Sequence, residues 1–118
     1  MRQVAPQHND DGNGKPLTEP VFLILTSLAQ QPRHGYALLQ DIHHMSAGRV
    51  TLSTGTLYGA LRRPLEEDWI EPFEQEDISR DKQAYRLTES GRQQLRAELD
   101  RIRQLARLAA SRLRTGEV

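Results

Sequence analysis

The sequence predicts a mainly α-helical fold with a small β-hairpin (α+β), followed by one long C-terminal helix. Three observations support this prediction. Apolar residues recur at helical spacing in three segments before residue 67, two extended runs flank a polar connection within residues 69–88, and one apolar stripe runs through residues 89–114. A chain of 118 residues provides for one small domain and an arm or two.

We therefore expect four parts. Residues 1–16 are polar and contain prolines, glycines and asparagines, so we expect a disordered N-terminal arm. Residues 17–88 are expected to form the folded domain and residues 89–114 the long helix. Residues 115–118 are expected to be a frayed tail.

The first helix of the domain is expected to begin at Thr18, whose hydroxyl can cap it, with Pro20 in the first turn. The run "VFLILTSLA" is apolar on nearly every face, which predicts a buried helix. After the break "QQPRHG", Leu38 and Ile42 share one stripe of a second, amphipathic helix. The following "AGRVTLS" combines a glycine turn with β-branched residues, and we expect a short strand there.

The third helix has Ser53 as its predicted N-cap and continues through "TGTLYGALRR". Its outward face carries Gly55 and Gly59, and an exposed glycine in a helix costs about 1 kcal/mol relative to alanine. Close approach of a bulky partner such as DNA would explain two of them. Pro64 interrupts the helical pattern, so we expect a kink or break near Arg63 and a short final turn that starts at Pro64.

The hairpin is predicted from the runs "WIEPFEQ" and "KQAYRLT", with Ile70, Tyr85 and Leu87 directed inward. Pro72 cannot donate to a central ladder, so its strand is expected at the edge of the sheet.

The final helix is expected to begin with a capping box formed by Ser90 and Gln93. Its apolar residues step alternately by four and three positions. So small a domain leaves this stripe without a partner in its own chain, which predicts a homodimer. The predicted dimerisation residues are Leu95, Leu99, Ile102, Ala106, Ala109 and Leu113.

The order helix, helix, short strand, helix, hairpin, long helix is the plan of a winged helix-turn-helix domain with a C-terminal dimerisation helix. In that plan the third helix contacts double-stranded DNA. Hydroxyls and free N–H groups at its start suit phosphates and base edges, and arginines two turns later can reach phosphates or guanine. The hairpin tip "SRDK" suits the flanking phosphate backbone. The predicted contacts are Ser53, Thr54, Gly55, Thr56, Tyr58, Arg62, Arg63, Arg80 and Lys82.

Each of these features also has a purely structural explanation. Ser53 is a competent cap in any protein, and Tyr58 can pack against the flank of its helix. The Arg62–Arg63 pair and the charged hairpin tip are also typical of solvated surfaces. The order of the elements favours DNA contact for all of them together.

Composition restricts the other classes of protein. Lys+Arg and Asp+Glu number 16 each, so any basic surface must be local. The absence of cysteine excludes disulfides and thiolate zinc sites and favours a cytoplasmic location. No stretch resembles a signal peptide or a membrane span. His43 and His44 are adjacent in a helix and point about 100° apart, so we expect no metal and no cofactor.

Two other functions remain to be weighed. No nucleophile, base and orienting group converge in the pattern, so an enzyme is not expected. The alternative is a winged-helix module that binds another protein through its acidic hairpin, where Glu71 and Glu74 lie.

The segments "HGYALLQDI", "LSTGTLYGALRRPLEEDWIEP" and "YRLTESGRQQL" together resemble the PadR-like transcriptional regulators, from about Leu17 to the end of the last helix. The resemblance implies a dimeric repressor of the shorter type on a pseudo-palindromic operator. It places the third helix in the major groove, the hairpin on the flanking backbone, and the last helix in the dimer contact together with the first. The DNA contacts it implies are Tyr36, Ser53, Thr54, Gly55, Thr56, Tyr58, Arg80 and Lys82.

Two positions depart from that family, and both lie at the junction between helix and hairpin. Pro64 stands where the family usually has leucine, and Asp68 where it usually has glycine. Members of the family often respond to small aromatic or hydrophobic compounds near the dimer interface. The final helix here has no aromatic residue, so the sequence identifies no effector.

Overall fold

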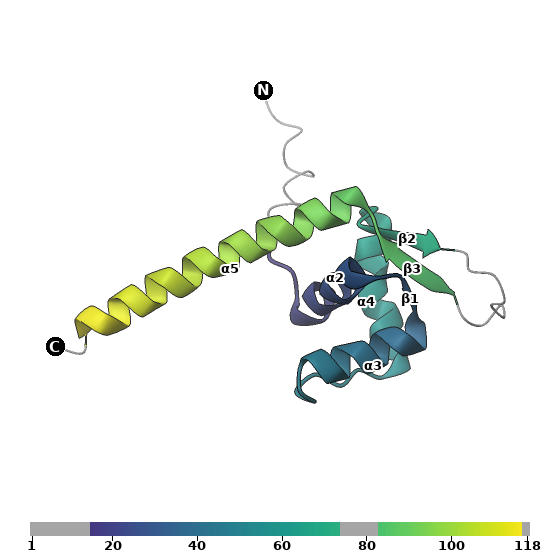
Figure 1. Cartoon of the computed structure of the whole chain (residues 1–118), viewed down its shortest axis with the longest axis horizontal. Coiled ribbons are helices and arrows are strands. Elements are labelled where there is room, and N and C mark those ends of the chain that lie inside the picture. The colour runs from purple at the N-terminus through teal and green to yellow at the C-terminus, as the bar shows by residue number, and fades with distance from the viewer. Residues whose placement is uncertain (1–14, 74–82, 117–118) are drawn as a thin grey trace, which may run out of the picture.

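A computed structural model describes residues 15–73 and 83–116 (Figure 1). The predicted α+β class is confirmed, because four helices accompany one small antiparallel sheet in this part of the chain. The expected disordered arm lies outside the described residues except for its last two positions. The elements are α2 (Glu19–Gln30), β1 (Arg33–His34), α3 (Gly35–Met45), α4 (Thr54–Glu66), β2 (Ile70–Phe73), β3 (Ala84–Leu87) and α5 (Glu89–Gly116).

The three strands form an antiparallel sheet in the order β1-β3-β2. In β2 and β3, Ile70 pairs with Leu87 and Phe73 pairs with Ala84. The edge position that Pro72 predicts for its strand is confirmed, because β3 lies in the middle.

The short strand expected in "AGRVTLS" was wrongly placed. This segment contains turns, with Ala47 and Gly48 both at positive φ, and no strand. The short strand lies before α3 instead, where Arg33 pairs with Tyr85. A strand needs a free sheet edge, and the residues that reach the open edge of β3 are Arg33 and His34.

The hydrophobic core lies between α2, the other helices and the sheet. Four apolar residues of α2 and Ser27 are buried, in agreement with the mostly apolar sequence of this helix. Burial of each such aliphatic side chain contributes about 1.5–3 kcal/mol. The fully buried large residues at the centre are Ile24, Leu25, Leu38, Ile42, Leu57, Leu61, Trp69 and Ile70.

Two of the three predicted helix caps are confirmed. The Thr18 hydroxyl accepts the N–H of Val21 at 3.3 Å, and the Ser53 hydroxyl accepts the N–H of Thr56 at 3.1 Å. The capping box at Ser90 is wrong, because the Thr88 hydroxyl accepts the Gly91 N–H at 3.0 Å. The Thr88 hydroxyl also contacts the carbonyl oxygens of Asp68 and Trp69, just before β2, and these contacts hold Thr88 at the start of α5.

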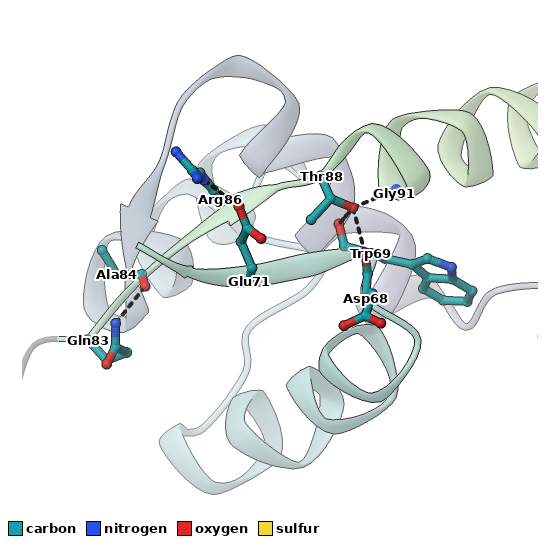
Figure 2. Close-up of polar contacts among 8 residues, drawn as sticks. All are labelled: Asp68, Trp69, Glu71, Gln83, Ala84, Arg86, Thr88 and Gly91. Carbon is teal, nitrogen blue, oxygen red and sulfur yellow. Dashed lines mark hydrogen bonds and ion pairs between the residues drawn. The ribbon is translucent and has the colours of Figure 1, made fainter. Parts of the chain in front are cut away.

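The junction between α4 and β2 is closed by that same Thr88 hydroxyl, which lies 2.6 Å from the carbonyl oxygen of Asp68 and 3.0 Å from that of Trp69 (Figure 2). Asp68 has φ +60°, the left-handed conformation that L side chains rarely adopt. The position therefore favours glycine, the residue that the resemblance in sequence implied there.

Of the kink or break expected near Arg63, the break and the separate turn from Pro64 are wrong, because α4 continues through Pro64 to Glu66. The Pro64 side chain is fully buried, and its carbonyl oxygen accepts the Trp69 N–H at 2.9 Å. Since proline removes only its own hydrogen bond to Ala60, burial of the ring in the core helps to offset that loss near the end of the helix.

The helix α5 has 28 residues, so it is about 42 Å long and extends well beyond the rest of the fold (Figure 1). Only Gly91 and Glu98 in it are buried. Residues 115 and 116, expected in a frayed tail, belong to the helix. None of the described helices is long and apolar enough to cross a membrane.

Candidate nucleic-acid interface

The N-terminal end of α4 presents a row of polar groups to solvent. Ser53, Thr54, Gly55 and Thr56 are all exposed. Besides capping the helix, Ser53 donates its hydroxyl hydrogen to the Thr56 hydroxyl at 3.0 Å. The first N–H groups of a helix have no partner within it, so this end can receive phosphate oxygens or base edges.

Two exposed tyrosines lie beside this helix end. Tyr36 at the start of α3 is 66% exposed and Tyr58 of α4 is 45% exposed. They border an open groove of about 270 Å³ between the two helices, which we call the tyrosine groove. Its lining residues are His34, Gly35, Tyr36, Leu39, Thr54, Leu57 and Tyr58.

The place of Tyr58 in this groove depends on Gly35. A Cβ atom at position 35 would lie 2.6 Å from the Tyr58 hydroxyl oxygen, closer than any real contact. Tyr58 also contributes to the raised pKa of Tyr85, whose main cause is burial. The sequence marks Gly35 only as part of a helix boundary, and no local signal links it to Tyr58.

The two glycines of α4 have no packing partner among the residues that the structure describes. A Cβ atom at Gly55 or at Gly59 would meet nothing within 4 Å. Neither position has the positive φ that would require glycine. The fold therefore tolerates alanine at both positions, and the smooth surface is available to a partner.

The two predicted arginines of α4 lie in different surroundings. Arg62 is exposed, on the same side of the helix as Gly55 and Gly59. Arg63 is half-buried, with its guanidinium carbon 5.0 Å from the centre of the Trp69 ring. The structure thus brings Arg62 to the outward face and gives Arg63 a contact within the fold.

The predicted contacts at the hairpin tip, Arg80 and Lys82, lie outside the described residues. The strands beside the tip are described, and Glu71 of β2 forms an ion pair with Arg86 of β3 at 2.6 Å (Figure 2). A stack of Arg86 over Phe73, 5.1 Å from the ring centre, lies in the same part of the hairpin.

The predicted dimerisation stripe of α5 is largely exposed. Leu95 packs partly against the core, whereas Leu99, Ile102 and Leu113 are 37%, 39% and 65% exposed and Ala106 and Ala109 are exposed as well. The sequence pattern missed two leucines that widen the stripe on one side, Leu105 and Leu108. Leu105 follows Ile102 by three residues and Leu108 follows Leu105 by three, and this spacing was the signal that would have included them.

No described residues form a metal site: within 15–73 and 83–116, no three His, Asp or Glu side chains converge on one point. His43 contacts the Thr51 hydroxyl at 3.0 Å. This contact gives the histidine a local role in the loop that follows α3.

The fold and this exposed helix end define the class of protein: a winged helix-turn-helix protein with a C-terminal helical extension. The transcriptional regulator PadR-like family model matches residues 24–97. The chain therefore belongs to the PadR-like family of transcriptional regulators.

Several solved structures share this fold. A transcriptional regulator from Clostridium thermocellum is 15% identical with a TM-score of 0.68, covering 94% of this chain and 97% of that one. A PadR family regulator from Clostridium difficile is 21% identical with a TM-score of 0.68, covering 81% and 99%. A PadR-like regulator from Bacillus cereus is 23% identical with a TM-score of 0.65, covering 79% and 89%.

One curated protein also matches in sequence. It is an uncharacterized 37.1 kDa protein in transposon TN4556 of Streptomyces fradiae, 36% identical over 85 residues. These residues are 72% of this chain, which spans only 23% of the length of that relative.

Proposed function

We propose that the chain is a homodimeric repressor that binds a pseudo-palindromic operator in the cytoplasm. One observation carries the DNA-reading part of the proposal. The first two turns of α4 expose hydroxyls and two glycines that no described atom packs against, next to the two tyrosines of the tyrosine groove, and Arg62 follows on the same side of the helix.

The physical chemistry of this surface suits a DNA duplex. The glycines let a sugar-phosphate backbone or groove floor approach the helix backbone, and the helix N-terminus favours negative charge. Tyr36 and Tyr58 can donate their hydroxyls to phosphate oxygens, which fixes the position of the helix. Arg62 lies two turns further along and can reach a phosphate or the O6 and N7 acceptors of guanine.

The dimer part of the proposal rests on α5. After Glu98 the helix continues for about 27 Å to Gly116 with no buried residue among those described. Its exposed apolar side chains, with the two alanines that permit close approach, form a face that we call the α5 apolar face. A twofold dimer would place two α4 helices about 34 Å apart and predicts half-sites separated by about 10 bp. The α5 apolar face consists of Leu99, Ile102, Leu105, Ala106, Leu108, Ala109 and Leu113.

The test is binding to the intergenic DNA beside the protein's own gene. Wild-type protein is expected to give a footprint with two halves, and Arg62→Ala is expected to weaken binding, because one good contact of this kind contributes about 1–3 kcal/mol. Glu66→Gln serves as the matched control, since it changes an exposed charge at the other end of the same helix. Equal binding by Arg62→Ala and wild type would contradict the proposed reading face.

The repressor assignment needs a separate measurement. In vitro transcription from the promoter inside the footprint is expected to fall as the protein is added. A rise in transcript would make the protein an activator. Retention of DNA binding after Glu71→Gln would argue against the alternative, a module that binds protein through an acidic hairpin.

A further inference from the structure

The direction in which α5 leaves the domain is fixed first at Gly91. A Cβ atom at this position would lie 2.0 Å from the Trp69 carbonyl oxygen and 2.8 Å from Cδ1 of Leu87. The helix backbone therefore lies directly against the start of β2. The Thr88 N–H also donates to the Trp69 carbonyl oxygen at 2.9 Å, which holds the first turn in place.

A second fixed point lies two turns later, at Glu98. Its side chain is only 6% exposed. One carboxylate oxygen accepts the N–H of Leu17, just before α2, at 3.3 Å. Arg101 donates to both carboxylate oxygens, at 3.0 and 2.5 Å. Glu98 therefore joins α5 to the start of α2 through an ionised, hydrogen-bonded contact.

The helix α4 also contributes to the environment of this carboxylate. The hydrogen bond from Arg101 is the main cause that lowers the pKa of Glu98, and the charge of Arg63 acts in the same direction. Arg63 is the residue whose guanidinium lies over Trp69. Glu98 is thus in electrostatic contact with the end of the helix whose beginning forms the candidate DNA interface.

Apolar packing does not replace this contact at the same level of α5. Leu95, one turn earlier, packs partly against the core, and an open pocket of about 330 Å³ lies beside Glu98, where α5 passes the start of α2. Beyond Glu98, no described residue of α5 is buried. The pocket is lined by Leu17, Glu19, Phe22, Glu98, Arg101 and Ile102.

A helix that is held at two positions has a fixed direction, whereas a helix that is held at one position can tilt about it. Gly91 and Glu98 are seven residues apart, or about 10 Å along the helix axis. Leu113 lies about 33 Å from Gly91, so a tilt of about 10° around Gly91 would move it by about 6 Å. A displacement of that size approaches the length of two base-pair steps.

We infer that Glu98 is a positioning residue that sets the angle between the α5 apolar face and α4, and thereby the half-site spacing that the dimer accepts. The inference rests on the proposed function for its DNA-binding part. In the proposed complex, Glu98 contacts neither DNA nor the second subunit. It acts through α5.

The first test measures the direction of α5 without DNA. The chain has no cysteine, so Gln40→Cys on α3 and Ser111→Cys on α5 give a clean pair of spin-label sites, both exposed. Labelled chains are diluted with unlabelled wild-type chains, so that the distance within one chain is measured whatever the oligomeric state. Glu98→Gln is expected to broaden the distance distribution and to shift its mean by several ångström relative to the unsubstituted background.

Two further variants keep this test decisive. Asp100→Asn is the matched control, because its carboxylate is 76% exposed on the same helix, and it is expected to leave the distribution unchanged. Arg101→Ala removes the partner of Glu98 from a 40% exposed position. It is expected to broaden the distribution as well, and it replaces Glu98→Gln if that variant does not fold.

The second test uses operators whose half-sites are moved apart by one or two base pairs. Wild type and Asp100→Asn are expected to lose affinity steeply with each insertion, whereas Glu98→Gln is expected to lose at least about threefold less. A structural role alone would lower all affinities by one factor and leave their ratios unchanged.

An unchanged distance distribution in both Glu98→Gln and Arg101→Ala would overturn the inference. Broader distributions with unchanged affinity ratios would overturn it also, since the angle would then not determine spacing. If wild type binds no operator, the proposed function fails, and the label pair still decides whether Glu98 holds α5 in place.

Discussion

Substitution of alanine for Gly55 and Gly59 is expected to stabilise the fold and weaken DNA binding at the same time. The added methyl groups would meet no atom of residues 15–73 and 83–116 within 4 Å, so they introduce no clash there. Gly59 lies in the helix interior, where alanine is more favourable by about 1 kcal/mol, and Gly55 in the first turn should contribute less. A gain of about 1 kcal/mol corresponds to a rise of about 4 °C in Tm for a domain of this size.

The same methyl groups would occupy the surface that DNA is proposed to approach. Overpacking of a close contact costs about 1–3 kcal/mol, so operator affinity should fall by about tenfold. Thermal unfolding at one fixed protein concentration and fluorescence anisotropy with labelled operator measure the two effects. A double variant with higher Tm and unchanged affinity would refute the assignment of this face to DNA, and one with lower Tm would refute the account of its packing.

Four further outcomes are expected. Gly91→Ala should lower the free energy of unfolding by about 2 kcal/mol, because its Cβ would lie 2.0 Å from the Trp69 carbonyl oxygen; a neutral result by denaturant titration would contradict this close approach. Asp68→Gly should raise the free energy of unfolding by about 1 kcal/mol, because it relieves a φ of +60°; a loss would mean that the aspartate side chain has a stabilising role. Ile102→Glu should convert a dimer into a monomer in analytical ultracentrifugation, and a monomeric wild type at micromolar concentration would disprove the α5 contact. Because the pKa of Glu98 is lowered in the folded state, its carboxylate contributes stability above pH 4.5 that is lost as the pH falls through the folded-state pKa. Glu98→Gln should therefore reduce the slope of the free energy of unfolding against pH on the acid side. An unchanged slope would mean that the acid dependence comes from the exposed Glu19–Arg49 pair and other carboxylates.

The sequence predicted those features that depend on neighbouring residues. Thr18 and Ser53 cap their helices through hydroxyls that reach three residues ahead, and such contacts are local. The edge position of the Pro72 strand follows from the chemistry of proline alone. The periodicity of α5 likewise follows from helical spacing within one segment.

The incorrect predictions concern features that depend on contacts between distant segments. The short strand lies at Arg33 because that residue reaches β3, about fifty positions away in sequence. The start of α5 is set by Thr88, whose hydroxyl reaches the Asp68 carbonyl oxygen. The continuity of α4 through Pro64 depends on burial of the ring in a core formed by other elements.

In the candidate site, too, the local features could be predicted from the sequence, whereas the contacts between elements could not. The exposed hydroxyls and glycines of α4 follow from its helical periodicity. The diversion of Arg63 to the Trp69 ring and the dependence of Tyr58 on Gly35 require the tertiary structure. Neither could be inferred from spacing, because the partners lie on different elements.

The central claim is that the first half of α4 reads DNA through phosphate and base contacts, and it is tested most directly by a salt titration. Binding of the wild-type protein to the intergenic DNA beside its own gene is measured by fluorescence anisotropy between 50 and 200 mM salt, next to a scrambled duplex of equal length. A dimer that neutralises about 6–10 phosphates should lose about 10³–10⁵ in affinity over this range and bind the scrambled duplex much more weakly throughout. Equal affinity for both duplexes, or affinity that does not change with salt, would contradict the account.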